Sequence, residues 1–309
     1  SLQAAVGGSA PGAAGAGYLN TTDLVTGGYE LHVPCYYDSG ADTTAVSMSG
    51  WTTGHCNQIK VYAPNNTATE VNRSQRHSGK WNDTAYRLEF TGTGYLIDCT
   101  ISYIAFEGIQ AYKPNAPTAL SSFFTARAAN IAFDSCIARG PGRISYNGNH
   151  VAGFYTCDGT EPVSGPVYHK NCLAYDFYEG STLFRGYGFS VWAANANLFY
   201  YNCTAVNCRI GFNNYVCSVA VYKNCLAQYG IDGWYRSSGT AGSTNNCSDI
   251  SGDAPGANAR TADVAFVDAA NDDFHLASND DGARDYGADL SADAAMPFSS
   301  DIDNQTRSG

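Results

Sequence analysis

Residues 200–227 read YYNCTAVNCRIGFNNYVCSVAVYKNCLA, a stretch that contains one short pattern twice. The pattern is a short apolar-polar run, then Asn or Ser, then Cys, then any residue, then Ala. It occurs four times, with copies that end at Ala138, Ala174, Ala205 and Ala227. Looser copies surround Cys99 and Cys247, and the spacing between successive cysteines of the series falls from 37 residues to 22. This series indicates a repeating unit of roughly 22 residues, with insertions in the earlier copies.

The repeated segments have the character of β-strands. They are rich in aromatic and β-branched residues, and they alternate with period 2 or run continuously apolar. Helical repeats need a period of 3.6, and neither a leucine-rich nor a tryptophan-aspartate signature is present. The sequence therefore predicts an all-β parallel solenoid, whose coils stack at ~4.8 Å. About ten to twelve coils would give a rod roughly 50 Å long.

Stacking of equivalent residues predicts two ladders along this solenoid. The repeated cysteines would form an inward ladder of small, soft hydrophobic side chains, and the repeated asparagines would form a ladder at a turn. The predicted cysteine ladder comprises Cys99, Cys136, Cys172, Cys203, Cys225 and Cys247.

The Asn-Cys steps resemble those of a known family, the right-handed parallel β-helix repeat proteins, which include pectate-lyase-like and tailspike-like solenoids. These steps are Asn171-Cys172, Asn202-Cys203, Asn224-Cys225 and Asn246-Cys247. The run FVDAANDDFHLAS at 266–278 looks like the last coil of such proteins, and TDLVTGGYELHVPCYYDSG at 22–40 looks like their capping region. The resemblance covers about residues 18–307. It implies a right-handed single-stranded solenoid with an N-terminal cap and an irregular acidic C-terminal tail. It implies little about activity, because this scaffold carries lyases, hydrolases, tailspikes, adhesins and inert fibres alike.

Composition divides the chain into four expected segments. They are a flexible Gly/Ala-rich arm (1–17), a cap with the first coils (18–90), the β-helix body (91–290) and a C-terminal tail (291–309). One last coil is expected at 263–276. The chain begins with Ser and its first 17 residues carry no charge, so we expect a processed product or a fragment.

The charge is concentrated at the C-terminal end. Residues 1–248 have a net charge of −1, whereas residues 249–309 have a net charge of −10. Nucleic acid needs a basic surface, so it is not an expected partner. No run approaches ~18 uninterrupted apolar residues, so no membrane span is expected.

The remaining cysteines and the sequons indicate where the protein is located relative to the cell. Cys35 with Cys56, and Cys208 with Cys217, could form disulfides that close short loops, although sequence cannot fix the connectivity. Possible N-glycosylation sites are Asn20, Asn65, Asn72, Asn82 and Asn304. Together with the low charge and the abundant Ser, Thr and Asn, these features favour an extracellular, cell-surface or virion-surface protein.

Catalytic groups are sparse in the regular body. Asp176, Glu179 and Arg185 come closest to a constellation, within an aromatic-rich run at 175–189, and could serve a polysaccharide lyase or glycosidase. The alternative is ordinary solvated loop charge. No zinc pattern, calcium loop, phosphate loop or dinucleotide fingerprint occurs, so no metal and no cofactor are expected.

Aromatic residues are the other candidates for a site. Tyr175, Tyr178, Trp192 and Trp234 could stack on sugars or line a protein interface, or simply stabilise the outside of the coils. The leading expectation is a structural subunit that self-associates into a fibre, spike or surface layer, with possible polysaccharide contact. The alternatives are a polysaccharide-degrading enzyme and a non-catalytic glycan-binding module.

Overall fold

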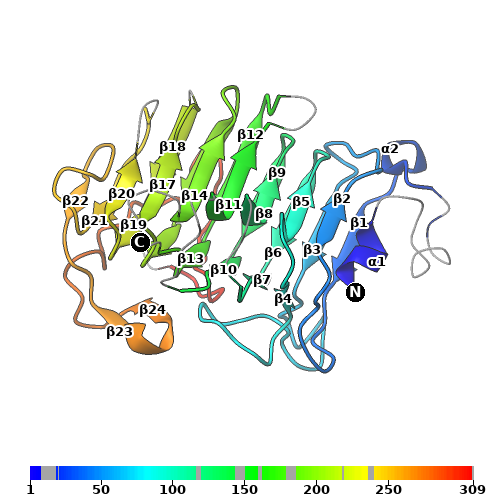
Figure 1. Cartoon of the computed structure of the whole chain (residues 1–309), viewed down its shortest axis with the longest axis horizontal. Coiled ribbons are helices and arrows are strands. Elements are labelled where there is room, and N and C mark those ends of the chain that lie inside the picture. The colour runs from blue at the N-terminus through cyan, green and yellow to red at the C-terminus, as the bar shows by residue number, and fades with distance from the viewer. Residues whose placement is uncertain are drawn as a thin grey trace.

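The computed structural model describes residues 1–7, 19, 21–115, 120–142, 150–158, 162–178, 186–217, 219–235 and 240–307. Nearly all of its regular elements belong to three long parallel sheets (Figure 1). The helical elements of this part of the chain are α1 (Leu2–Val6), α2 (Leu24–Gly27) and the 3₁₀ turn η1 (Ala269–Asn271). None of these helices has the length and apolar character that a membrane span requires.

The three sheets are named here I, II and III. Sheet I contains β1 (Leu31–Pro34), β3 (Ile59–Tyr62), β6 (Ile104–Glu107), β9 (Ile131–Asp134), β12 (Pro166–Lys170), β15 (Asn197–Tyr201) and β18 (Val219–Lys223). Sheet II contains β4 (Arg87–Glu89), β7 (Gln110–Tyr112), β10 (Ile137–Arg139), β13 (Leu173–Tyr175), β16 (Thr204–Val206), β19 (Leu226–Gln228), β21 (Cys247–Ser248) and β22 (Arg260–Thr261). Sheet III contains β2 (Val46–Met48), β5 (Ile97–Cys99), β8 (Ser121–Ala126), β11 (Val151–Cys157), β14 (Gly186–Trp192), β17 (Ile210–Asn214) and β20 (Asp232–Tyr235).

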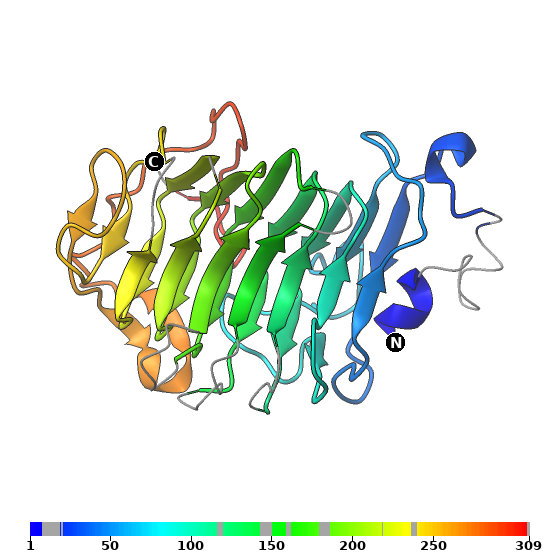
Figure 2. The ribbon, with the colours of Figure 1, turned by 45° about the horizontal axis from the view of Figure 1, so that its top comes forward.

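The chain visits the sheets in the order III, I, II, and it repeats this order from β2 to β19. Each strand pairs in parallel with the strands one coil before and one coil after it, as β12 does with β9 and β15. Figure 2 shows the resulting row of aligned arrows from the blue to the yellow end. The predicted all-β parallel arrangement is confirmed, and it is compatible with a parallel β-helix.

The stack is shorter than the sequence suggests. The sheets hold seven, eight and seven strands, which is fewer than the ten to twelve coils expected. Long connections between strands take up residues that were expected to form further coils. The connection between β3 and β4 alone extends from residue 63 to residue 86. The parallel strands run from β1, within the segment expected to hold the cap and the first coils, to β22, which ends at residue 261.

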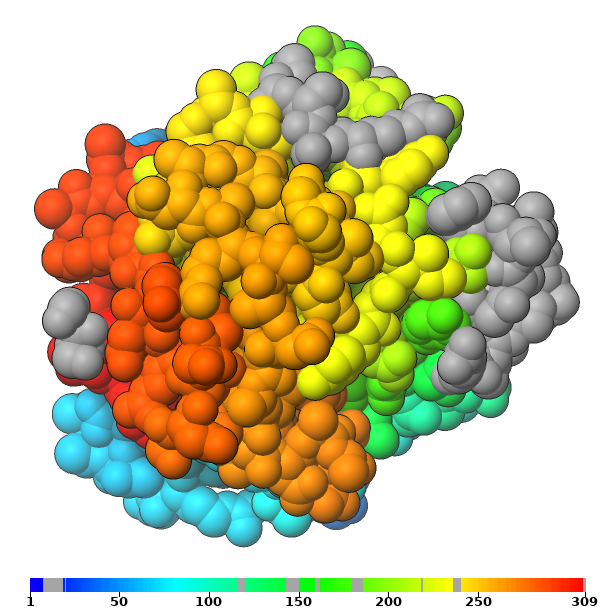
Figure 3. Space-filling view, turned by 90° about the vertical axis from the view of Figure 1, so that its left-hand side faces the viewer, coloured from blue at the N-terminus to red at the C-terminus, as the bar shows by residue number. Residues whose placement is uncertain are grey.

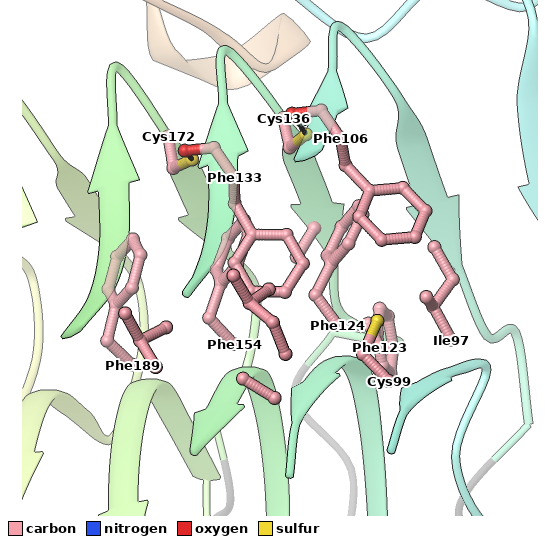
Figure 4. Close-up of a cluster of buried hydrophobic side chains, with 14 of the residues drawn as sticks. Ile97, Cys99, Phe106, Phe123, Phe124, Phe133, Cys136, Phe154, Cys172 and Phe189 are labelled. Atoms are coloured by element: carbon pink, nitrogen blue, oxygen red, sulfur yellow. Dashed lines mark hydrogen bonds between the residues drawn. The ribbon is translucent and has the colours of Figure 1, made fainter. Parts of the chain in front are cut away.

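Two aromatic columns form the core. In sheet III, each ring lies 4.8 Å from the next along Phe124, Phe154, Phe189, Phe212 and Trp234. In sheet I, centroid separations lie between 4.5 and 5.7 Å along Phe106, Phe133, His169, Tyr200 and Tyr222. All of these side chains are buried, and Figure 4 shows part of both columns. Like-over-like stacking therefore joins successive coils through one continuous interior.

Four cysteines stack at the corner between sheets I and II. Cys136, Cys172, Cys203 and Cys225 each lie directly before a strand of sheet II, and each is buried. The residue before each of them has a left-handed backbone, with φ between 51° and 55°. Asparagine tolerates this conformation better than most residues, which explains the Asn of the Asn-Cys step.

The predicted six-cysteine ladder is wrong for Cys99. This residue ends β5 in sheet III, away from the corner that holds Cys136 and Cys172 (Figure 4). In its coil, the corner position belongs to Ile109, because the next residue, Gln110, pairs with Ile137.

The prediction is also wrong for Cys247, by one residue of register. Cys247 pairs with Leu226, so Asn246 takes the position that Cys225 holds one coil earlier. The left-handed residue of this coil is accordingly Asn245, with φ 55°. An Asn-Asn-Cys run allows the sequence pattern to slip by one position, and a one-residue slip reverses the face that each side chain takes.

The proposed disulfides are absent, since all eleven cysteines are free thiols. Cys35 follows β1 and Cys56 precedes β3; because these strands pair in parallel and in register, the two residues lie at opposite ends of the pair. Cys208 and Cys217 likewise flank the two ends of β17. A disulfide needs Cα atoms within about 7 Å, which neither arrangement permits.

Residues 1–7 pack beside β2 and so differ from the flexible arm that was expected. Leu2 and Val6 of α1 are buried, and the Trp51 indole Nε1 donates to the Val6 carbonyl oxygen at 3.0 Å. Gly7 bridges to Ser49 in parallel. The rest of the expected arm, up to residue 17, lies outside the described residues.

The C-terminal segment does not continue the stack. β23 (Phe266–Asp268) and β24 (Asp273–Leu276) form an antiparallel hairpin outside the three sheets, so the expected coil at 263–276 is wrong. The chain then runs back along the coils, because the Asn171 side-chain amide donates to the Ser300 carbonyl oxygen at 3.1 Å. In the end-on view of Figure 3 the orange and red atoms lie to one side of the yellow ones. The Asn224 amide donates to the Ala288 carbonyl oxygen at 3.0 Å. We call residues 266–307 the C-terminal strap.

Candidate functional site

The outer face of sheet III gathers polar and aromatic side chains in rows. Phe124 and Phe154 point into the core, so their neighbours Thr125 and Tyr155 point to the opposite face. Because the strands are in register, equivalent outer residues of successive coils form one row. This outer row consists of Asp98, Thr125, Tyr155, Ser190, Asn213 and Tyr235.

A second row follows the corner between sheets III and I. Cys157 pairs with Trp192, and Arg127 occupies the preceding rung because Ala126 pairs with Thr156. Trp192 stacks on Tyr215, with ring centroids 4.3 Å apart and planes 10° from parallel. Trp192 is 50% exposed and Tyr215 is 37% exposed, which makes them a solvent-facing aromatic pair.

A pocket of about 460 Å³ opens on the same corner. Its lining includes Thr53, Thr100, Ser102, Arg127 and Ser164. These side chains present hydroxyl groups and a guanidinium to whatever enters it.

Arg127 is fixed by the outer row. Its guanidinium donates to the Asp98 carboxylate at 3.3 Å and lies over the Tyr95 ring, 5.8 Å from the centroid. Burial raises the pKa of Asp98, and the positive charge of Arg127 opposes that rise. The pair therefore anchors one cationic group at the edge of the pocket.

A histidine and a serine meet in the middle of the outer face. The His150 Nε2 lies 3.1 Å from the Ser190 Oγ, and the Asn213 side-chain amide donates to the same oxygen at 3.0 Å. The imidazole stacks on Tyr187 at 4.4 Å and contacts the tilted ring of Tyr155 at 4.7 Å, centroid to centroid. Sequence reasoning missed this group, because its members come from separate coils.

Two carboxylates meet at the free edge of sheet III. Burial and the neighbouring Asp253 raise the pKa of Asp232, in β20, to about 6. Asp253 accepts hydrogen bonds from the Trp234 backbone N–H at 3.1 Å and from the Ser248 hydroxyl at 2.9 Å. Two close carboxylates resist simultaneous ionisation, so Asp232 loses its proton at a higher pH than an ordinary Asp does.

The catalytic candidates from the sequence are placed only in part. Asp176 lies half-buried after β13 with a left-handed backbone, φ 63°, and accepts a hydrogen bond from the Asn207 amide at 2.5 Å. Burial raises the pKa of its carboxyl group. Glu179 and Arg185 lie outside the described residues, so the three-residue constellation stays a prediction.

The predicted aromatic site is wrong for two of its four members. Tyr175 is fully buried, with its hydroxyl 3.3 Å from the Asp272 carboxylate, and Trp234 is 4% exposed at the end of the sheet III column. Tyr178 is half-buried. Trp192 alone is well exposed, and its stacking partner Tyr215 was missed.

The sequons differ in their surroundings. Asn72 and Asn304 are exposed. Asn65 and Asn82 are half-buried, and their side-chain oxygens accept hydrogen bonds from Ser74 and Thr84 respectively. Asn20 lies outside the described residues.

Within the described part of the chain, no group of three or more His, Cys, Asp or Glu side chains is arranged to hold a metal ion. Comparison with protein-family models, with curated proteins and with solved structures finds no match.

Proposed function

We propose that this chain is a structural β-helix subunit of an extracellular, cell-surface or virion-surface assembly, and that it contacts glycans along the corner between sheets III and I. The observation that carries the proposal is the succession of Arg127, Cys157 and Trp192 on consecutive rungs, with a pocket at one end and the Trp192–Tyr215 pair at the other. Such a strip combines an aromatic surface with hydroxyl and guanidinium donors.

Each part of the strip suits one part of a sugar. The C–H face of a pyranose packs on an exposed indole or phenol ring, and its hydroxyls need convergent polar partners. Thr53, Ser102 and Arg127 supply such partners in the pocket. Because the row follows the long axis of the stack, an extended oligosaccharide matches it better than a compact one.

Removal of the indole tests the glycan contact. Titration calorimetry with a panel of neutral and acidic oligosaccharides should detect binding. The Trp192→Ala variant should bind about tenfold more weakly, which corresponds to ~1.4 kcal/mol. Tyr36→Ala is the matched control, because Tyr36 is 52% exposed but follows β1, away from this corner. Absence of binding across the panel, or equal affinity of Trp192→Ala and the parent, would contradict the proposal.

The structural role rests on the continuous core and on exposed apolar groups beside the aromatic pair. Val216 is 40% exposed and Val219 is 36% exposed, so they extend the apolar surface of Tyr215 toward β18. A surface of this kind suits contact with a second copy. Light scattering should show oligomers or filaments, whereas a monomer at high concentration would argue against assembly.

The proposal includes the hand of the coil and the class of solenoid. We infer a right-handed β-helix of the pectate-lyase-like or tailspike-like class from the repeated Asn-Cys corner. Connections between parallel strands of one sheet are right-handed in about 98% of cases, which supports this hand. An experimental density map with a left-handed coil would contradict it.

One observation favours an enzyme as the second candidate. The pKa of Asp232, raised to about 6 by burial and by Asp253, lies closer to neutral pH than that of an ordinary Asp, as a general acid for glycoside hydrolysis requires. A reducing-end assay on the same panel should then show turnover that Asp232→Asn abolishes. Absence of turnover by the parent protein rejects this candidate and leaves the glycan contact untouched.

A further inference from the structure

We propose that Ser190 and His150 form a nucleophile–base pair that hydrolyses small acyl esters at the outer face of sheet III. The pair has the separation that proton transfer requires, since His150 Nε2 and Ser190 Oγ are 3.1 Å apart. This chemistry differs from the glycan contact and from the carboxylate pair.

The hydrogen-bond directions fit a serine ready to lose its proton. The Asn213 amide nitrogen can only donate, so the Ser190 oxygen accepts this 3.0 Å bond. In the tautomer that carries its proton on Nδ1, His150 Nε2 can accept the serine proton across the same 3.1 Å contact. In that tautomer the oxygen is bonded to one donor and one acceptor, the arrangement that an attacking hydroxyl needs.

The surrounding residues hold the base in place. The imidazole contacts the rings of Tyr187 and Tyr155, with centroids 4.4 and 4.7 Å away. Aromatic faces also stabilise the imidazolium that forms once the proton has moved. Ser190 belongs to β14, which has a paired strand on each side, so its position is rigid.

The reaction proceeds in two balanced steps. The Ser190 oxygen bonds to the ester carbonyl carbon while its proton passes to His150, and the leaving alcohol departs with that proton. Water then attacks the acyl-serine, its proton moves to His150, and the carboxylic acid is released as the serine is regenerated. The Asn213 amide holds the Ser190 oxygen in position for the attack.

Burial sets the substrate size. Ser190 is 2% exposed and Tyr187 is 8% exposed, whereas His150 is half-buried. Burial of this degree restricts the proposed substrate to the smallest acyl group, acetyl. The identity of the alcohol as a sugar rests on the proposed function. The hydrolysis of the acyl ester does not depend on it.

Hydrolysis of 4-nitrophenyl acetate tests the proposal. The full chain should release nitrophenol and, on acid quenching, carry an acetyl group on the peptide that contains Ser190. Ser190→Ala and His150→Asn should each lower turnover about 100-fold or more. Ser122→Ala, a serine of the same sheet, is the matched control and should keep the parent rate. Circular dichroism melting curves check that every variant folds.

The outcomes separate the two proposals. Loss of turnover in Ser190→Ala with unchanged melting supports the pair, whether or not any oligosaccharide binds. A parent rate no higher than that of Ser190→Ala, or an acetyl group on a different residue, overturns it. Sugar binding without ester turnover retains the proposed function and rejects this inference alone.

Discussion

Burial protects the thiol groups from reaction. Ten of the eleven cysteines are buried and only Cys56 is exposed. Burial raises the pKa of Cys35 to about 12 and that of Cys157 to about 11, so their thiols stay protonated at neutral pH.

We therefore expect iodoacetamide to modify Cys56 alone in the native protein and all eleven cysteines after unfolding in guanidinium. Peptide mass spectrometry measures both states. A Cys56→Ser variant should lose the native reaction entirely. Rapid native modification of Cys136 or Cys203 would contradict the packing described here.

Small residues set the distance between sheets II and III. An added Cβ at Gly211 would lie 2.8 Å from the Gly233 carbonyl oxygen and 3.0 Å from the Ala227 Cβ. Both neighbours belong to the packed interior, so neither can move freely.

Gly211→Ala should therefore lower the free energy of unfolding by about 1–3 kcal/mol, as overpacking in a core does. Urea unfolding measures this change. Gly40→Ala is the control, because nothing lies within 4 Å of the added atom there, and it should shift stability by less than ~0.5 kcal/mol. Equal stability of the two variants would show that the sheets can separate at little cost.

At the scale of elements, the C-terminal strap is fastened by an ionic clamp. His275 in β24 contacts the Asp273 carboxylate at 2.5 Å through Nδ1 and the Asp303 carboxylate at 3.0 Å through Nε2. The Asp303 hydrogen bond, supported by Asp273, raises the pKa of His275 from 6.5 to about 9. Farther along the strap, Lys223 pairs with Asp293 at 2.5 Å.

The sign of the pH dependence follows from that shift. A raised histidine pKa contributes stability that is complete below pH 6.5 and is lost as the pH rises through about 9. Hydrogen exchange of residues 273–276 and 299–307 should therefore accelerate across this interval, after correction for the intrinsic rate. His275→Gln should exchange faster at low pH and show little further change. His55→Gln, at an exposed site, should behave as the parent protein.

The sequence pattern predicted the position of one corner of each coil well and the positions of the other corners poorly. The Asn-Cys step marks the corner between sheets I and II because only a left-handed residue followed by a small buried one fits there. A second repeat in sheet III also exists, since GFYTC at 153–157, GFSVW at 188–192 and GFNNY at 211–215 occupy equivalent positions. Aligning these runs would have paired Trp192 with Tyr215 from sequence alone.

Other elements carried no local signal. The hairpin of β23 and β24 packs on the coils through a long-range contact of Phe274 with Tyr175, which no repeat predicts. His150 and Ser190 are forty residues apart and meet only because successive coils stack. Chemistry assembled across coils is visible only once the register of the coils is known.

At the scale of the whole molecule, equivalent residues of successive coils stack along one axis. A solenoid of this kind gains its stability from contacts between neighbouring coils, so its interior should be periodic from end to end. The aromatic columns and the corner cysteines both result from this periodicity. The rows on the outer face, on which both proposals rest, have their geometry because the coils stack in register.

An anomalous sulfur difference map from crystals of the protein tests this claim most directly. The account predicts four peaks in a line for Cys136, Cys172, Cys203 and Cys225, at intervals of about 4.8 Å, with the peaks of Cys99 and Cys247 off that line. Sulfur peaks of these four residues scattered without a common axis or spacing would contradict it.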